Sequence, residues 1–258
     1  MSTITILEKA YGRYSKSAIK SLTQTLTELC AGLKAEINVL GRTESNWIQI
    51  KISGEDEAVL TKCIERDFGL APVTIDKIDA KSTVRGKIIE SGQIGYGLYV
   101  DIGIFSPEIH DALYPLYKMR LQLTKEKKIS AHQITEKFCL FDNFPIEVFI
   151  EKIDFDKKEI EVELSKKQLS IFKDWASSQL DRVIVLGATR AHIKAALLKT
   201  KHFQDIIEIQ RLGLLEHAII CKKGTYAPGI ISRIGPLLPK TPLYAFHPKE
   251  AEKLMLVE

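Results

Sequence analysis

Basic residues gather in the last third of the chain in a pattern that suits contact with phosphate groups. Residues 169–258 contain 13 Lys and Arg but only 8 Asp and Glu, and no acid occurs between Asp181 and Asp205. At 3.6 residues per turn, a helix beginning near residue 190 places three cations on one face: Arg190, Lys194 and Lys201. A helix face of one charge sign predicts phosphate contact, and simple solvation of that face is the alternative.

These cations depend on a predicted α/β framework. Periodicity predicts a connector helix over 165–180, a buried strand over 182–186, a helix over 190–200 and strands over 206–209, 217–222 and 243–246. The turn after the strand at 217–222 holds Lys222, Lys223 and Gly224, a basic combination typical of loops that clamp a nucleic-acid backbone. Residues 169–258 are therefore predicted to form a basic α/β domain.

Catalytic motifs are sparse. The six histidines show no HExxH spacing, no serine lies in a GxSxG motif, and no cysteine has the local sequence of a nucleophile. The run VIVLGATRAH at 183–192 joins a strand to a helix through a glycine, but it lacks both the GxGxxG and the GxxxxGK[ST] patterns. We predict no enzymatic activity and no cofactor. A nucleotide-dependent enzyme centred on 187–190 is a third-ranked alternative.

Alternating apolar and polar residues predict strands over 84–103 and 146–165. In the first segment, Val84, Ile88, Leu98, Val100 and Ile102 alternate with Arg85, Lys87, Tyr99 and Asp101. In the second, apolar residues alternate on both sides of a turn near Asp156. One face of these strands is expected in a core, which leaves Arg85 and Lys87 on the solvated face.

The two segments resemble the S1 domain, a five-stranded OB-type barrel that binds single-stranded RNA. The matching residues are Gly86, the run Tyr96-Gly97-x-Tyr99-Val100-Asp101 and the hairpin from Ile153 to Ser165. The resemblance implies a barrel whose outer face carries Tyr96 and Tyr99, on which bases stack, beside the basic Arg85 and Lys87.

Two departures from the S1 pattern favour an alternative. Pro115 stands where the family has a histidine, and Glu159, Glu161 and Glu163 are the outward residues of the last strand. Three carboxylates on one strand face repel phosphate. The alternative is a barrel that docks against a protein instead of RNA.

The first third predicts a separate sandwich of helices and strands in the order β-α-β-β-α. Strands are expected over 4–7, 36–40 and 47–52, with helices over 15–33 and 53–68. The predicted fold is thus an α+β multidomain chain. Its parts are an N-terminal α/β sandwich (1–80), a central S1-like OB-fold β-barrel (81–168) and a C-terminal α/β domain (169–258).

Composition places the chain among ordinary globular proteins, with 45% hydrophobic and 27% charged residues. The four cysteines have no CxxC spacing, so reduced thiols are expected and a metal site is not. No long apolar run or secretory leader is recognisable, which predicts a cytoplasmic protein without membrane partners.

The order of the three parts resembles an uncharacterised protein family conserved in archaea. It is also similar to the RNA-binding cap subunits of the archaeal exosome, and its first two parts are similar to the stalk subunit of archaeal RNA polymerase. These resemblances imply RNA or ribonucleoprotein partners such as the ribosome, the exosome or RNA polymerase. The function expected from the sequence is therefore a non-enzymatic RNA-binding factor of archaeal information processing. A protein-interaction adaptor in a transcription or translation complex is the alternative.

Overall fold

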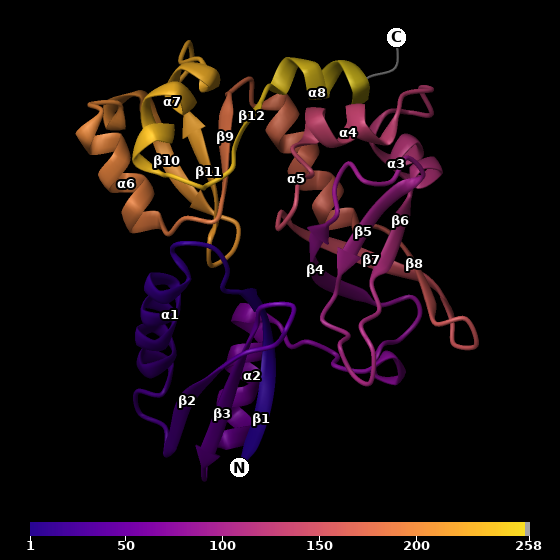
Figure 1. Cartoon of the computed structure of the whole chain (residues 1–258), viewed down its shortest axis with the longest axis vertical. Coiled ribbons are helices and arrows are strands. Elements are labelled where there is room, and N and C mark those ends of the chain that lie inside the picture. Colours follow the sequence, from indigo (N-terminus) through magenta and orange to yellow (C-terminus); the bar gives the residue numbers. More distant parts are fainter. Residues whose placement is uncertain (256–258) are drawn as a thin grey trace.

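A computed structural model describes residues 1–255, and over these residues the chain forms eight α-helices, two open sheets and one closed barrel. In Figure 1 the barrel and the C-terminal sheet stand side by side, and the N-terminal sheet lies below the C-terminal one. This arrangement confirms the mixed α+β class. It also brings all three regions together at one place, where Lys87 of the barrel meets Glu8 of the N-terminal region and Glu216 of the C-terminal one.

The N-terminal region is a three-stranded antiparallel sheet in the order β1-β3-β2 with two helices on one face. Its elements are β1 (Ser2–Lys9), α1 (Ser15–Leu29), β2 (Ala35–Arg42), β3 (Trp47–Gly54) and α2 (Glu57–Phe68). Ile48, Ile50 and Ile52 of β3 are buried, which is the face that alternation predicts. Helix α1 ends four residues before the predicted end, because Gly32 adopts a φ of 84° in the turn that reverses the chain into β2.

The central region is a closed five-stranded barrel in the order β4-β5-β6-β8-β7. Its strands are β4 (Thr83–Ile89), β5 (Gly97–Asp101), β6 (Ala112–Pro115), β7 (Pro145–Asp154) and β8 (Glu159–Leu164). Neighbours are antiparallel except β6 and β8, which run parallel. Ile88, Leu98 and Val100 are fully buried, as their alternation predicts.

Gly86 is required at its position in β4. A Cβ there would lie 2.6 Å from the carbonyl oxygen of Asp101 and 2.7 Å from Cγ1 of Val100. Strand β4 can therefore approach β5 this closely only without a side chain at residue 86. Two helices that the sequence analysis did not foresee lie between β6 and β7, namely α3 (Leu116–Leu123) and α4 (Ala131–Phe138).

The C-terminal region is a four-stranded antiparallel sheet in the order β10-β11-β9-β12. Its elements are β9 (Arg182–Leu186), α6 (Arg190–Lys199), β10 (Ile206–Arg211), β11 (Glu216–Cys221), α7 (Ala227–Ile234), β12 (Leu243–Phe246) and α8 (Pro248–Met255). All five residues of β9 are buried. Val183 and Val185 belong to a core shared with the N-terminal region, whereas Ile184 and Leu186 belong to a core shared with the barrel.

Helix α5 (Lys166–Ser177) connects the barrel to the C-terminal sheet. Its Phe172 and Trp175 are buried and pack edge to face, with ring centroids 6.0 Å apart. Trp175 also packs against Phe246 of β12, at 5.4 Å. The barrel and the C-terminal sheet therefore share one apolar core, which fixes their relative position.

Candidate nucleic-acid interface

Tyr96 and Tyr99 lie on the outside of the barrel, as predicted. Tyr96 is 56% exposed, and Tyr99 is half-buried on β5. The two rings meet edge to face at 6.4 Å, and their hydroxyl oxygens are 3.0 Å apart. The hydrogen bond to Tyr96, together with partial burial, raises the pKa of Tyr99 to about 12, so the Tyr99 hydroxyl is neutral at physiological pH and can donate or accept a hydrogen bond.

The two tyrosines line a groove of about 460 Å³, here called the aromatic groove. Its lining residues come from β5, β6 and the β7–β8 hairpin: Tyr96, Tyr99, Asp111, Leu113, Lys152, Asp154, Lys158, Glu159, Ile160 and Glu161. This volume falls within the usual range of ligand sites. The groove is open to solvent on the outer face of the barrel, so an extended chain can lie across it.

The groove contains more acids than bases. Lys152 and Lys158 are exposed, but Lys158 pairs with Glu108 at 3.0 Å. Asp111 lies in the wall of the groove, and its Oδ1 is buried without a hydrogen-bond partner among residues 1–255. Burial, followed by the nearby Asp101, raises the pKa of Asp111 to about 6. The groove therefore offers stacking surfaces and hydrogen-bond acceptors, with few free cations.

The glutamates of β8 are partly neutralised. Glu163 accepts a hydrogen bond from Lys118 at 2.9 Å, and Lys118 also pairs with Glu151. The hydroxyl of Tyr117, a 58% exposed residue of α3, donates to Glu161. Only Glu159 faces solvent without such a contact within the described chain. The repulsion of phosphate predicted for this strand is reduced accordingly.

The structure contradicts the prediction for Lys87, whose side chain is only 2% exposed. Arg85, two residues earlier on β4, is exposed as predicted. Both side chains point away from the barrel core, but the N-terminal and C-terminal regions cover the barrel at Lys87. RNA cannot reach this ammonium group, so Lys87 is removed from the candidate interface.

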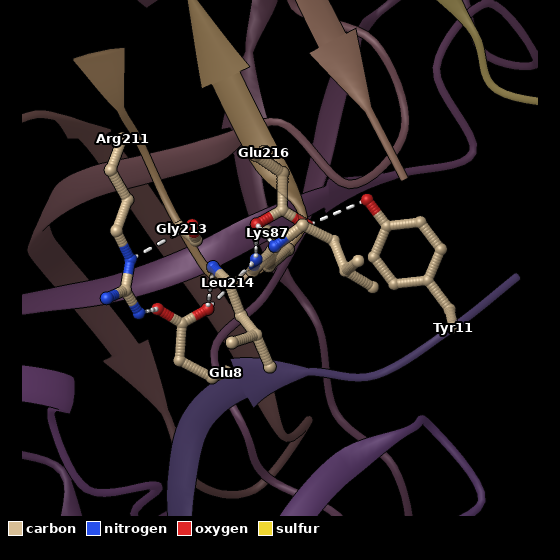
Figure 2. Close-up of polar contacts among 8 residues, drawn as sticks. Glu8, Tyr11, Lys87, Arg211, Gly213, Leu214 and Glu216 are labelled. Atoms are coloured by element: carbon tan, nitrogen blue, oxygen red, sulfur yellow. Dashed lines mark hydrogen bonds and ion pairs between the residues drawn. The ribbon is translucent and has the colours of Figure 1, made fainter. Parts of the chain in front are cut away.

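Lys87 instead joins the three regions through a buried ion cluster (Figure 2). Its ammonium lies 2.5 Å from Glu216 of β11 and 3.5 Å from Glu8 of β1. The Tyr11 hydroxyl donates to Glu216 at 2.7 Å, and the backbone N–H of Leu214 donates to Glu8 at 2.9 Å. Burial raises the pKa of Glu216, an effect that Lys87 opposes. A side chain at Gly213 would collide with the Glu216 carboxylate.

A second buried ion pair lies beside this cluster. Asp101 of β5 accepts hydrogen bonds from the indole N–H of Trp47, with both oxygens at 3.0 Å, and pairs with Lys9 at 2.6 Å. Lys87 and Asp101 are cross-strand neighbours in the barrel. We call these two groups together the junction; its residues are Glu8, Lys9, Tyr11, Trp47, Lys87, Asp101 and Glu216.

The predicted cations of the last third are all exposed, but they do not form one stripe. Arg190 and Lys194 lie on α6 one turn apart. The helix ends at Lys199, and Lys201 follows it with a φ of 62°, so Lys201 has left the helical register. Lys222 and Lys223 lie in the turn after β11, and the backbone N–H of Lys222 donates to Asp205. Whether any of them contacts phosphate stays a prediction.

A pocket of about 490 Å³ opens beside Gly187, where the nucleotide alternative requires one. However, the backbone N–H groups of Gly187 and Ala188 both donate to the carbonyl of Leu215. No residue of α6 is among those that line the pocket. The N–H groups that would hold a phosphate are thus occupied or directed elsewhere, which gives this alternative no support.

Three stretches of the chain match one family of unknown function. They are the DUF2110 N-terminal domain over residues 3–73, the central domain over 78–176 and the C-terminal domain over 180–244. The chain belongs to the DUF2110 family. No curated protein matches it. The five-stranded closed barrel of this DUF2110 protein is consistent with an OB-fold.

Two solved structures are similar to parts of this DUF2110 chain. The first, a protein from vaccinia virus (Wisconsin strain), covers 34% of this chain and 89% of its own, with 18% sequence identity and a TM-score of 0.23. A chain of the a/eIF2alpha-aDim2p-rRNA complex from Pyrococcus horikoshii OT3 covers 49% of this chain and 66% of its own, with 10% identity and a TM-score of 0.27. Such low TM-scores support no transfer of function.

Sequence reasoning missed several residues of the aromatic groove. Lys152, Lys158 and Asp111 reach it from the β7–β8 hairpin and from the start of β6, and Tyr117 reaches its edge from the unforeseen α3. The alternation predicts the hairpin, but only the closed barrel places its residues in one groove with Tyr96 and Tyr99. None of the helices within residues 1–255 is long and apolar enough to span a membrane.

Proposed function

We propose that this DUF2110 protein binds single-stranded RNA in the aromatic groove and acts, without catalysis, as a factor of information processing. The observation that supports this most directly is the ring pair on the outside of the barrel, formed by the exposed Tyr96 just before β5 and the half-buried Tyr99 on β5. Every base has a π face, so exposed rings of this kind bind unpaired strands with little sequence preference. The S1-like pattern of the sequence points to the same two side chains.

The polar residues of the groove suit base edges better than phosphates. Asp111 and Glu161 offer carboxylate acceptors, which pair with the amino groups of bases. Lys152 is exposed at the groove without a carboxylate partner among the described residues and is available to a phosphate. The proposed partners are RNA within the ribosome, the exosome or a transcribing polymerase, in which single strands are exposed.

One observation favours a second candidate function. Asp111, Asp154, Glu159 and Glu161 outnumber the two lysines of the groove. A basic peptide segment of a partner protein would be attracted by this charge, and its side chains would pack on the tyrosine rings. The protein would then be an adaptor in a transcription or translation complex.

The test is the double variant Y96A/Y99A of the full chain, measured for binding to a fluorescent single-stranded RNA. If both rings stack, affinity falls by about 2 to 4 kcal/mol, because each stack contributes roughly 1 to 3 kcal/mol. The fold is expected to survive, because both rings lie outside the barrel core. Y226A is the matched control, because Tyr226 is 65% exposed and lies on the C-terminal region.

Unchanged RNA affinity in a folded Y96A/Y99A protein would refute the groove as the RNA site. Competition separates the two candidates. A basic peptide that binds the wild type and loses affinity in the double variant, while RNA affinity stays constant, would establish the adaptor function instead.

A further inference from the structure

Helices α1 and α6, from the first and last regions of the chain, meet on one side of the molecule. The ring of Tyr14, the N-cap residue of α1, lies 4.3 Å from the ring of His192 in α6. Leu22 of α1 and Ile193 of α6 belong to one apolar core. Figure 1 shows the two helices one above the other at the same edge, α6 in orange and α1 in indigo.

The first half of α1 and the whole of α6 are basic and lack acids, whereas the last turn of α1 holds one exposed acid, Glu28. Between Lys9 and Glu28 the sequence contains Arg13, Lys16 and Lys20 but no Asp or Glu. The three cations are exposed, as are Arg190 and Lys194 of α6. None of the five makes an ion pair with a carboxylate in the part of the chain that the structure describes. The overall charge of the N-terminal region does not reveal this surface, because residues 1–80 contain 11 acids and 10 bases in all.

A groove of about 550 Å³ connects the two helices. Ser21 of α1 lines one side, and Arg190 and Lys194 line the other. Its floor is formed by β10 and the segment before it, where Phe203 is 41% and Ile207 is 53% exposed. The ammonium of Lys194 lies 5.8 Å from the centroid of the Phe203 ring. One acid, Glu208, also lines the groove.

We propose that this α1–α6 surface, defined by Arg13, Lys16, Lys20, Arg190 and Lys194, binds the sugar–phosphate backbone of RNA while Phe203 stacks on a base. The inference rests on the proposed RNA binding and adds a contact area that the N-terminal helix supplies. Unpaired cations beside an exposed aromatic ring are the combination with which proteins hold single strands. An acidic protein segment would need only the cations.

The α1–α6 surface and the aromatic groove would contact different parts of one RNA strand. The aromatic groove has few free cations, so stacking dominates there, whereas the α1–α6 surface has five cations and one accessible ring. Contacts to phosphates position a strand without reading its sequence. A strand held at both places would have its backbone fixed by the helices and its bases by the barrel.

The experiment uses the full-length chain and a single-stranded RNA of mixed sequence, titrated at several salt concentrations. The variant is K16Q/K20Q in α1, and the matched control is K166Q/K173Q, two exposed lysines of α5. Each phosphate contact contributes about 0.7 to the log–log salt slope for a single strand. K16Q/K20Q is expected to flatten the slope by about 1.4, and the control is expected to leave it unchanged.

A slope for K16Q/K20Q equal to that of the wild type would overturn the proposal. If Y96A/Y99A loses affinity while K16Q/K20Q does not, the proposed function stands and this inference falls. If K16Q/K20Q flattens the slope while Y96A/Y99A binds as wild type does, the inference stands and the aromatic groove is refuted. The proposal would also be overturned if the protein bound no RNA but bound a poly-glutamate peptide, and K16Q/K20Q lowered the affinity for that peptide. This result would indicate an acidic protein partner.

Discussion

The outer face of strands β4 and β5 has two ends with opposite surroundings. At one end Tyr99 lies in a groove open to solvent, and at the other the cross-strand pair Lys87 and Asp101 is buried beneath the other two regions. All three side chains point out of the same barrel. An outward position on a strand therefore predicts solvent only where no other domain covers that strand, and here the cover begins between Tyr99 and Asp101.

Lys87→Met, at the buried end, is expected to lower the stability of the protein more than any other variant proposed here. It leaves the carboxylate of Glu216 buried without its cation and leaves Glu8 with only the more distant Arg211, at 3.7 Å, and breaking a buried pair in this way costs about 3 to 5 kcal/mol. Urea unfolding of the full chain measures the loss. Arg85→Met on the same strand is the control and is expected to change stability by less than about 0.5 kcal/mol, because Arg85 is exposed. Equal losses of stability for the two variants would show that the buried ion pairs of Lys87 do not stabilise the fold.

Trp47→Phe tests the other half of the junction. It removes an indole N–H that donates to Asp101 and opens space at a fully buried position. A loss of about 2 to 3 kcal/mol is expected, because a buried carboxylate loses a donor and packing is lost with it. The same urea titration measures it, with Trp175 left in place as the fluorescent reporter. A variant as stable as the wild type would mean that Lys9 and the backbone N–H of Gly103 satisfy Asp101 without the indole.

Asp111 lies between the two ends, and its variant has the smallest expected effect. Its pKa is raised to about 6 in the folded chain, mainly by burial, with Asp101 and Glu90 adding to the shift and Lys9 opposing it. The folded state therefore keeps this proton to higher pH than the unfolded state, and stability falls as pH rises from about 4 to 6. Asp111→Asn removes this loss, so its stability relative to the wild type is expected to increase from pH 4 to pH 7. A difference that is constant with pH, measured by urea unfolding, would contradict the shift.

Much of the fold follows from local pattern. Strands β9 and β12 begin and end at the predicted residues, and the alternation in β4, β5, β7 and β8 gives the barrel its interior. Helices α3, α4 and α8 were not foreseen, because each is eight residues long, too short to show a convincing helical period. Each is held by tertiary contacts more than by its own propensity.

The candidate site was predictable where it depends on one strand and not where it depends on contacts between regions. Tyr96 and Tyr99 were found because a run of glycine and aromatic residues marks them. Lys87 was misassigned because alternation distinguishes the two faces of a strand but does not reveal which face another domain covers. The basic surface shared by α1 and α6 was missed because its cations are far apart in the sequence.

The buried cluster around Lys87 also has a consequence for how the protein is made. Glu8 and Lys87 are 79 residues apart, and Lys87 and Glu216 are 129 residues apart. During synthesis Glu8 leaves the ribosome long before Lys87. Lys87 in turn is made before β11, the strand that carries its closest partner, Glu216. In the closed molecule Glu8 and Lys87 both find their partners in other regions of the chain. We therefore expect the final closure of the molecule to follow translation of β11, and a ribosome-bound chain that stops before residue 216 to remain open at the place where its three regions later meet.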